Sequence, residues 1–157
     1  MKIHPDWITA SEEAYVVGQI ASDMELHKVK LSRSRNRILR YGWDYSDPSK
    51  WTLEIPLWLP HPPHGFGSFD NVTINEYLKG QAIPAHTDSL AFGDVAILSM
   101  VSDAVLRFTH PTSKAVDYKL PARSLAIMSG ELRTDWKHEM LPLEGDVRYS
   151  AIFRKKL

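Results

Sequence analysis

The sequence predicts an α+β domain that is mainly β, built as a helix-flanked antiparallel barrel or jelly roll. From residue 71 onward, short apolar or alternating runs follow one another, separated by turn signals at roughly 8–12-residue spacing. One stretch near the start of the chain has the periodicity of an amphipathic helix. The chain has 157 residues, 43% of them hydrophobic, which suffices for a single domain over residues 1–157 with a sizeable core.

The helix is expected over about residues 10–26. Thr9 and Glu12 form a capping-box pattern, and apolar residues then recur at helical spacing, at Ala14, Val17, Ile20 or Ala21, and Met24. The run RILRYGWDYS (37–46) predicts a strand that ends at the Asp47-Pro48 turn. Prolines at 56, 60, 62 and 63 exclude a central strand or helix interior, so residues 55–67 are expected to form a loop.

The β core is expected in the remaining runs. They are NVTINEYL (71–78), QAIPAH (81–86), DVAILSMV (94–101), AVLRFTH (104–110), AVDYKLP (115–121), SLAIMSG (124–130) and VRYSAIFRK (147–155). Pairs such as Lys79-Gly80, His110-Pro111 and Ser129-Gly130 supply the turns between them.

Charge and composition limit the classes of function. The chain has 19 basic and 19 acidic residues, a balance that argues against an extensive duplex-binding surface. It has no cysteine, so any metal must be bound by nitrogen and oxygen atoms. The start of the chain lacks the apolar core of a signal peptide, and no run approaches membrane-spanning length. We therefore expect a cytoplasmic monomer with no membrane partner.

Residues 27–40 are locally basic and contain no acid. The basic side chains are Lys28, Lys30, Arg33, Arg35, Arg37 and Arg40. Such a run forms either a solvated face or an edge that contacts phosphates.

A metal site is suggested by His86 and Asp88, which are two positions apart in a run that is expected to be extended, so that both side chains project the same way. His138 follows the run SLAIMSG and can close a triangle from a neighbouring strand. Two His and one carboxylate form the facial triad of non-haem Fe(II) oxygenases. The alternatives are a His-x-Asp pair that arises by chance and a surface histidine.

The last predicted strand carries groups suited to a small dianion. Arg148, Ser150 and Arg154 fall on one face by the strand period of two, and roughly 20 Å separates the Cα atoms of the two arginines. Guanidinium groups pair with carboxylates in a bidentate way. Asn75 and Tyr77 share a face just before the His86 run and offer an amide and a hydroxyl.

Together these motifs resemble the AlkB family of Fe(II)/2-oxoglutarate dioxygenases over about residues 36–155. NEY (75–77) is similar to the family's Asn-x-Tyr, HTD (86–88) to its His-x-Asp, GELR (130–133) to its Gly-x-x-Arg, and RYSAIFR (148–154) to its Arg-x-Asn-x-x-x-Arg ending. RYGWDY (40–45) resembles the strand that helps form the family's nucleotide-recognition lid. IPAHTDS (83–89) and LPARSLAIMSGE (120–131) look most like the homologues that act on tRNA wobble uridines.

The resemblance implies a double-stranded β-helix core over residues 71–157, with a helix and substrate-lid region over residues 1–70. It implies that Fe(II) is held by His86, Asp88 and His138. It also implies that 2-oxoglutarate is held by Asn75, Tyr77, Arg148, Ser150 and Arg154, with Arg148 favoured for the distal carboxylate. Arg40, Trp43 and Tyr45 are the expected substrate-binding residues on the lid. The implied reaction uses O2 to hydroxylate, or oxidatively demethylate, an alkylated base in nucleic acid, as in DNA or RNA repair.

Two positions depart from the family pattern. Ser150 stands where the family has Asn on the final strand, an exchange shared by the wobble-uridine homologues. Leu90 stands where DNA-repair members have an acid that reads the damaged base, so recognition of methylated adenine or cytosine in that form is not expected. A hydroxylase of protein side chains or small molecules, and a non-catalytic jelly-roll binding module, remain as alternatives.

Overall fold

The protein is described by a computed structural model that covers residues 1–32, 35–63 and 66–157. Its elements in chain order are β1 (Lys2–His4), α1 (Ala10–Leu26), β2 (Arg37–Gly42), β3 (Asn71–Leu78), β4 (Ile83–His86), β5 (Phe92–Met100), β6 (Ala104–His110), β7 (Ser113–Leu120), β8 (Leu125–Met128), α2 (Glu131–Thr134), β9 (Lys137–Met140) and β10 (Val147–Lys156). Within these described residues, no helix is long and apolar enough to cross a membrane.

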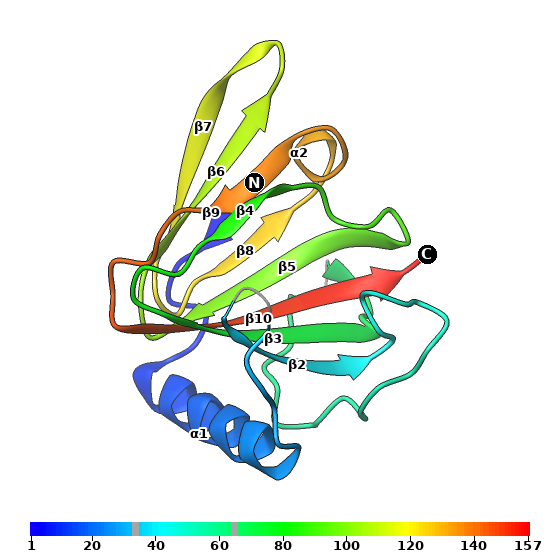
Figure 1. The fold of residues 1–157 in the computed structure, drawn as a ribbon, viewed down its shortest axis with the longest axis vertical. Helices are drawn as coiled ribbons and strands as arrows, with labels where there is room; N and C mark the ends of the chain where they lie inside the picture. Colours follow the sequence, from blue (N-terminus) through cyan, green and yellow to red (C-terminus); the bar gives the residue numbers. More distant parts are fainter. Residues whose placement is uncertain (33–34, 64–65) are drawn as a thin grey trace.

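Two antiparallel sheets form the core. The larger has six strands in the order β1-β8-β5-β10-β3-β2, and the smaller has four in the order β4-β9-β6-β7. In Figure 1, α1 lies along the larger sheet, on the side away from the smaller one. The predicted mainly β jelly-roll fold with an N-terminal helix is therefore confirmed. The division of the chain at residue 70 stays a prediction.

Helix α1 begins with the predicted capping box. The Glu12 N–H donates to Thr9 Oγ1 at 3.1 Å, and the Thr9 N–H donates to Glu12 Oε2 at 2.7 Å. The bounds match the prediction, but the buried face is Val16, Ile20 and Met24. Ala14 is exposed, so the inward face is rotated from the predicted one, because the i, i+4 series of the larger side chains packs on the sheet.

The larger sheet separates two apolar cores. Val72 and Ile74 of β3 and Phe153 of β10 pack with α1, whereas Tyr77 and Met140 belong to the core between the sheets. Alternation along each strand sends every second side chain to the opposite face. The side chains at odd positions of β3 and at even positions of β10 therefore point into the space between the sheets. The polar ones include Asn71, Thr73 and Asn75 on β3 and Arg148, Ser150 and Arg154 on β10.

The lid-side strand is shorter than the sequence predicts. Strand β2 ends at Gly42, not at residue 46, because Gly42 adopts a φ of +74°. A Cβ at this position would overlap the carbonyl group of Asp70, so the close approach requires glycine. Beyond it, Trp43 and Trp51 form an isolated antiparallel bridge. The described parts of residues 55–67 contain neither helix nor strand of the core, as expected for this proline-rich loop; residues 64 and 65 lie outside the described residues.

A charged cluster joins β2, β3 and β10 on the helix side of the larger sheet. Arg37 donates to both carboxylate oxygens of Glu76, at 2.7 and 2.6 Å, and the Tyr149 hydroxyl donates to Glu76 Oε2 at 2.8 Å. The hydrogen bonds from Arg37 lower the pKa of Glu76 below its usual value. Arg37 thus has a structural partner and faces away from the space between the sheets.

Glu76→Gln is expected to make the free energy of unfolding less dependent on pH in the acidic range. Because the pKa of Glu76 is lower in the folded than in the unfolded chain, its charge stabilises the fold above the unfolded pKa, about 4.3. That contribution is lost as the pH falls through the folded pKa. Urea unfolding at pH 7 and pH 3 should show that the free energy of unfolding falls less between the two pH values for the variant than for the parent. Asp117→Asn, at an exposed ion pair, is the control; equal losses for Glu76→Gln and the parent would contradict this prediction.

Candidate active site

His86 and His138 face each other across two paired strands. His86 is the last residue of β4, and it pairs in register with His138 of β9. The centroids of the two imidazole rings are 4.4 Å apart. The structure thus brings together two residues that are 52 positions apart in the sequence (138 − 86).

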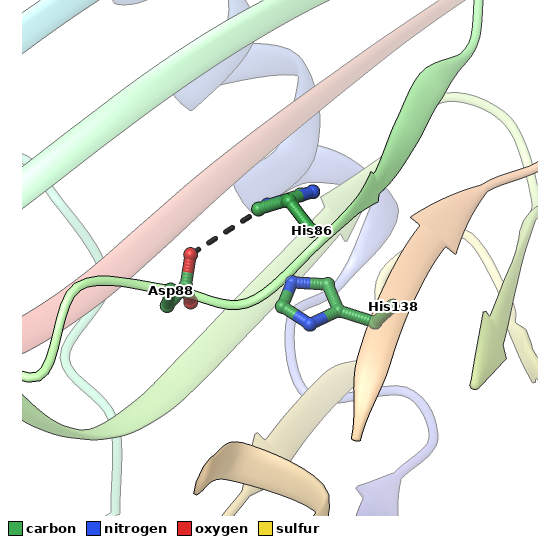
Figure 2. A group of neighbouring side chains, drawn as sticks. All are labelled: His86, Asp88 and His138. Atoms are coloured by element: carbon green, nitrogen blue, oxygen red, sulfur yellow. Dashed lines mark ion pairs between the residues drawn. The ribbon is translucent and has the colours of Figure 1, made fainter. Parts of the chain in front are cut away.

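Asp88 completes the cluster from the segment between β4 and β5. Its Oδ1 atom is 3.7 Å from His86 Nε2. One donor atom from each of His86, Asp88 and His138 can be chosen so that all lie within 4.8 Å of one another. Figure 2 shows the three side chains converging on one point from two strands and the adjoining loop. This spacing allows all three to bind a single ion.

The protonation of His138 and Asp88 suits metal binding, whereas the hydrogen bond with Asp88 raises the pKa of His86, so that a proton competes with a metal ion for this imidazole. His86 Nδ1 lies 2.9 Å from the carbonyl oxygen of Pro84; an N–H donated there leaves Nε2 free as a ligand. Burial lowers the pKa of His138 to about 4, so this imidazole is neutral at neutral pH. Burial opposes ionisation of Asp88, but His86, Arg154 and the neighbouring groups outweigh it and hold the pKa of Asp88 below its ordinary value.

The donor set fits Fe(II). Two imidazole nitrogens and one carboxylate oxygen are the protein ligands of non-haem Fe(II) oxygenases, and they leave further positions open. His138 Nδ1 is buried and has no hydrogen-bond partner within the described residues, so one nitrogen of this ring lacks a partner unless a ligand supplies it. The three residues are therefore a candidate metal centre.

A cavity between the sheets adjoins the candidate metal centre. We call it the inner cavity. The space between its walls is about 470 Å³, part of which is open solvent at its mouth. It is lined by all three candidate ligands and by four of the five residues predicted to bind 2-oxoglutarate, namely Tyr77, Arg148, Ser150 and Arg154. Apolar side chains complete the wall, including Val95, Leu106 and Met128.

Arg148 is a buried cation at the inner cavity without an acidic partner among the described residues. Its side chain is 2% exposed, donates to Ser99 Oγ at 2.9 Å, and contacts Met140 Sδ at 3.5 Å. Its buried Nε atom has no hydrogen-bond partner in the part of the chain that the structure describes. Burial lowers the pKa of Arg148. A buried guanidinium without a carboxylate is costly, so this position favours an anionic ligand.

Arg154 differs from Arg148 because it is tied to the metal centre. Its Nη2 atom is 3.7 Å from Asp88 Oδ1, and Nη1 donates to Asn71 and Thr73 at 3.2 and 3.3 Å. Its guanidinium also lies 4.3 Å from the ring centroid of Tyr45. The contrast between the two arginines supports Arg148 as the residue for the distal carboxylate.

Tyr45 contacts the metal centre directly, although the sequence predicted it as a substrate residue. Its hydroxyl donates to Asp88 Oδ1 at 2.8 Å and accepts the Ser89 N–H at 3.0 Å. Its ring stacks on Phe92, with centroids 5.7 Å apart. Tyr45 therefore orients the candidate metal carboxylate from the lid side.

A second, outer cavity shares a wall with the first. It is lined by Arg40 and Tyr45 from the predicted substrate set and by Asn36 and Asn75. His86, Asp88 and Arg154 line both cavities. Asn75, predicted to bind 2-oxoglutarate, thus lines the outer cavity and is absent from the lining of the inner one.

The remaining predicted residues lie elsewhere. Trp43 lines neither cavity; its ring packs against Trp51 and lies 3.9 Å from Lys156 Nζ, so its substrate role stays a prediction. In the basic segment, Arg40 lines the outer cavity and Arg37 does not, while Arg33 lies outside the described residues. Leu90 is 70% exposed.

Arg133 is a residue of the site to which the sequence assigned no role. It comes from α2, is 2% exposed, and donates to the carbonyl oxygens of Asp88, Ser89, Phe92 and Gly93, at 3.3, 2.6, 2.7 and 3.0 Å. It thereby fixes the loop that carries Asp88 to the helix that precedes His138. The GELR motif contained this arginine, but a motif does not reveal that its partners are four backbone carbonyls.

Arg133→Met is expected to weaken metal binding by about 10–100-fold, the range seen when a residue that orients a metal ligand is lost. Four carbonyls would lose their donor, and the Asp88 loop would open more often. Mn²⁺ titration and hydrogen exchange of residues 88–93 measure the two effects. Arg107→Met, at an exposed pair with Asp117, is the control. Unchanged Mn²⁺ affinity despite faster exchange would leave Arg133 a purely structural residue.

The chain is similar in sequence to known proteins of the ALKBH8 type. No family model matches the chain. It is 32% identical over 163 residues to the Xenopus tropicalis tRNA (carboxymethyluridine(34)-5-O)-methyltransferase alkbh8, a match that covers 90% of this chain and 25% of that protein. It is 26% identical over 172 residues to the Arabidopsis thaliana alkylated DNA repair protein ALKBH8 homolog, covering 85% of this chain and 48% of the relative.

This chain is AlkB-like. It spans about a quarter of the Xenopus relative and about half of the Arabidopsis one. Two solved structures share the fold of the AlkB-like chain, each with a TM-score of 0.66: a Pseudomonas putida prolyl-4-hydroxylase, 13% identical and covering 99% of this chain and 92% of its own, and OsALKBH1, 11% identical and covering 98% and 95%. At these identities the structures establish the fold alone.

Proposed function

We propose that the AlkB-like chain is a dioxygenase that uses Fe(II), 2-oxoglutarate and O2 to hydroxylate a C–H bond. The observation that carries the proposal is that one cavity joins a two-His, one-carboxylate donor set with Arg148, a buried cation without an acidic partner among the described residues. Fe(II) and 2-oxoglutarate, when bound, supply the oxidising power that places one oxygen atom of O2 on the substrate carbon, with succinate and CO2 as coproducts.

The chain's own residues would divide the work of binding. His86, Asp88 and His138 would hold the metal. Arg148 would bind the distal carboxylate of 2-oxoglutarate, with hydroxyls from Tyr77 and Ser150 nearby in the same wall. Asp88 is oriented by Tyr45 and balanced by Arg154. The apolar wall keeps water away from the reacting groups, which strengthens each polar contact inside.

We propose a modified base in nucleic acid as the substrate, with a tRNA uridine as the first candidate. Support comes from the relatives, one named for tRNA carboxymethyluridine at position 34 and one for alkylated DNA. The exposed, apolar Leu90 favours uridine over methylated adenine or cytosine, because no acid stands at that position. A flipped or single-stranded base needs only a small footprint, which suits a chain of zero net charge. A cytoplasmic location and a monomeric state stay predictions.

The test is product formation across a substrate panel. The panel contains stem-loops with uridine, 5-carboxymethyluridine or its methyl ester at the position matching uridine 34, oligonucleotides with methylated adenine or cytosine, and free nucleosides. Succinate and the oxidised nucleoside are measured together, with Asp88→Asn as the blank. We expect succinate coupled to an oxidised uridine. Succinate without any changed nucleoside would overturn the nucleic-acid substrate but not the oxygenase activity. An oxidised nucleoside that keeps its methyl group would indicate hydroxylation, and one that has lost it would indicate demethylation.

A hydroxylase of protein side chains or small molecules is the second candidate. The observation that favours it is the position of Arg37, which pairs with Glu76 on the helix side and adds no charge to the cavity mouth. Succinate release stimulated by a peptide library or a metabolite mixture, but not by any nucleic acid, would establish this alternative. A non-catalytic jelly-roll module would not account for the donor set, or for a buried Arg148 that has no acidic partner in the described part of the chain.

A further inference from the structure

The outer cavity has a charge that no described residue balances. The space between its walls is about 600 Å³, part of which is open solvent, and its lining contains two guanidinium groups, Arg40 and Arg154. Asp88 is the one acid among the described lining residues, and it is 3.7 Å from Arg154. Arg40 forms no ion pair with any described residue. The positive charge of Arg40 is therefore uncompensated at this wall.

The position of Arg40 directs its side chain toward the cavity. Arg40 on β2 pairs in register with Thr73 on β3, so the two side chains lie on the same face of the sheet. Thr73 in turn accepts a hydrogen bond from Arg154 at 3.3 Å, which places it between the two arginines. Arg40 Nε is buried and has no hydrogen-bond partner in the described part of the chain. A buried N–H without a partner is costly until a ligand satisfies it.

Two buried amides add further donors beside Arg40. Ser32 donates to Asn36 Oδ1 at 2.6 Å, and Asn36 Nδ2 approaches Asn75 Oδ1 at 3.4 Å. Both amide oxygens are thus used as acceptors within the protein. The groups left for a ligand are N–H donors, chiefly the Nδ2 atom of Asn75, which has no acceptor among the described residues. The two amides therefore offer a ligand N–H donors and not acceptors.

We propose that Arg40 and Asn75 form an oxyanion subsite in the outer cavity, which binds a carboxylate or phosphate group of the substrate. The inference rests on the proposed function, since it concerns the substrate of the same centre. Arg40 lines the outer cavity and not the inner one, so the subsite is separate from the place proposed for 2-oxoglutarate. The carboxylate would be a substituent on the base, and the phosphate would belong to the backbone beside it.

The test compares binding by the parent chain, Arg40→Met, Arg40→Lys and Arg37→Met. Arg37 is on the same strand but points to the other face, so it is the matched control for the loss of one positive charge. Each chain is loaded with Mn²⁺ and N-oxalylglycine, which prevents turnover. The probes are the nucleosides 5-carboxymethyluridine and its uncharged methyl ester, and a stem-loop that carries either base. The thermal shift with Mn²⁺ and N-oxalylglycine shows that the inner site of each variant is intact.

We expect the dissociation constant of Arg40→Met for charged probes to rise about 10-fold or more, with recovery in Arg40→Lys and no such change in Arg37→Met. If the loss separates the acid from the ester nucleoside, the group bound is the carboxylate. If it weakens both stem-loops equally and neither nucleoside, the group bound is a phosphate. Equal affinity of Arg40→Met and the parent for every probe, or an equal loss for the acid nucleoside and the uncharged ester nucleoside, would overturn the subsite. Failure of the parent to bind any probe while the thermal shift persists would overturn the proposed substrate, and the subsite with it.

Discussion

Asp88→Asn is expected to abolish 2-oxoglutarate turnover and to weaken metal binding by more than the roughly 10–100-fold that follows the loss of an orienting residue. The substitution keeps the volume of the side chain and an oxygen that accepts from Tyr45. It removes the negative charge that lies 3.7 Å from both His86 Nε2 and Arg154 Nη2. Turnover is measured as succinate release, and metal binding by Mn²⁺ titration.

Asp94→Asn is the matched control for this prediction. Asp94 lies on β5, six positions after Asp88 (94 − 88), and its side chain is exposed. It should leave both metal affinity and turnover unchanged. An Asp88→Asn protein that still binds Mn²⁺ like the parent would show that the candidate metal centre is wrong.

Arg148→Met is expected to separate cosubstrate binding from stability. Losing two charge-assisted hydrogen bonds to a carboxylate should raise the dissociation constant for 2-oxoglutarate by about 100-fold or more. The chain without ligands should keep or gain thermal stability, because Met replaces a guanidinium that is 2% exposed and has no acidic partner among the described residues. Mn²⁺ affinity should be unchanged. Melting temperature is measured with Mn²⁺ alone and with Mn²⁺ plus 2-oxoglutarate.

Arg107→Met provides the comparison, since Arg107 forms an exposed pair with Asp117. It should keep the full response to 2-oxoglutarate. A large loss of melting temperature in Arg148→Met without ligands, together with a retained 2-oxoglutarate response, would make Arg148 a structural residue.

The sequence predicted the elements whose pattern is local. The helix over residues 10–26 follows from its capping box and apolar spacing, and strands such as β3 and β6 follow from short alternating runs bounded by turns. Strand β9, which carries His138, was not predicted, because its sequence KHEM has one apolar residue, whereas the equally short β4 and β8 lie in more apolar runs. Strand β2 was predicted four residues too long, because the bend at Gly42 depends on contact with Asp70.

The candidate site divides in the same way. The motifs predicted that His86, Asp88 and His138 form one site. The pairing of β4 with β9 is the physical reason why the two histidines lie close together. The roles of Tyr45 and Arg133 could not be predicted, because both act through contacts with residues 40 or more positions away. The resemblance favoured Arg148 over Arg154 for the distal carboxylate, but the sequence itself contained no physical reason for that choice. The structure supplies a reason, because Arg154 is the arginine that lies beside Asp88.

The most direct test of the account is the joint binding of Fe(II) and 2-oxoglutarate without O2. If His86, Asp88 and His138 hold the metal and Arg148 holds the cosubstrate, adding 2-oxoglutarate to the Fe(II) form should produce a visible charge-transfer band from chelation of the iron. The band should be absent in Asp88→Asn, and Arg148→Met should need about 100-fold more 2-oxoglutarate to produce it. A parent chain that binds Fe(II) but shows no band at saturating 2-oxoglutarate, or a band that persists in Asp88→Asn, would contradict the account.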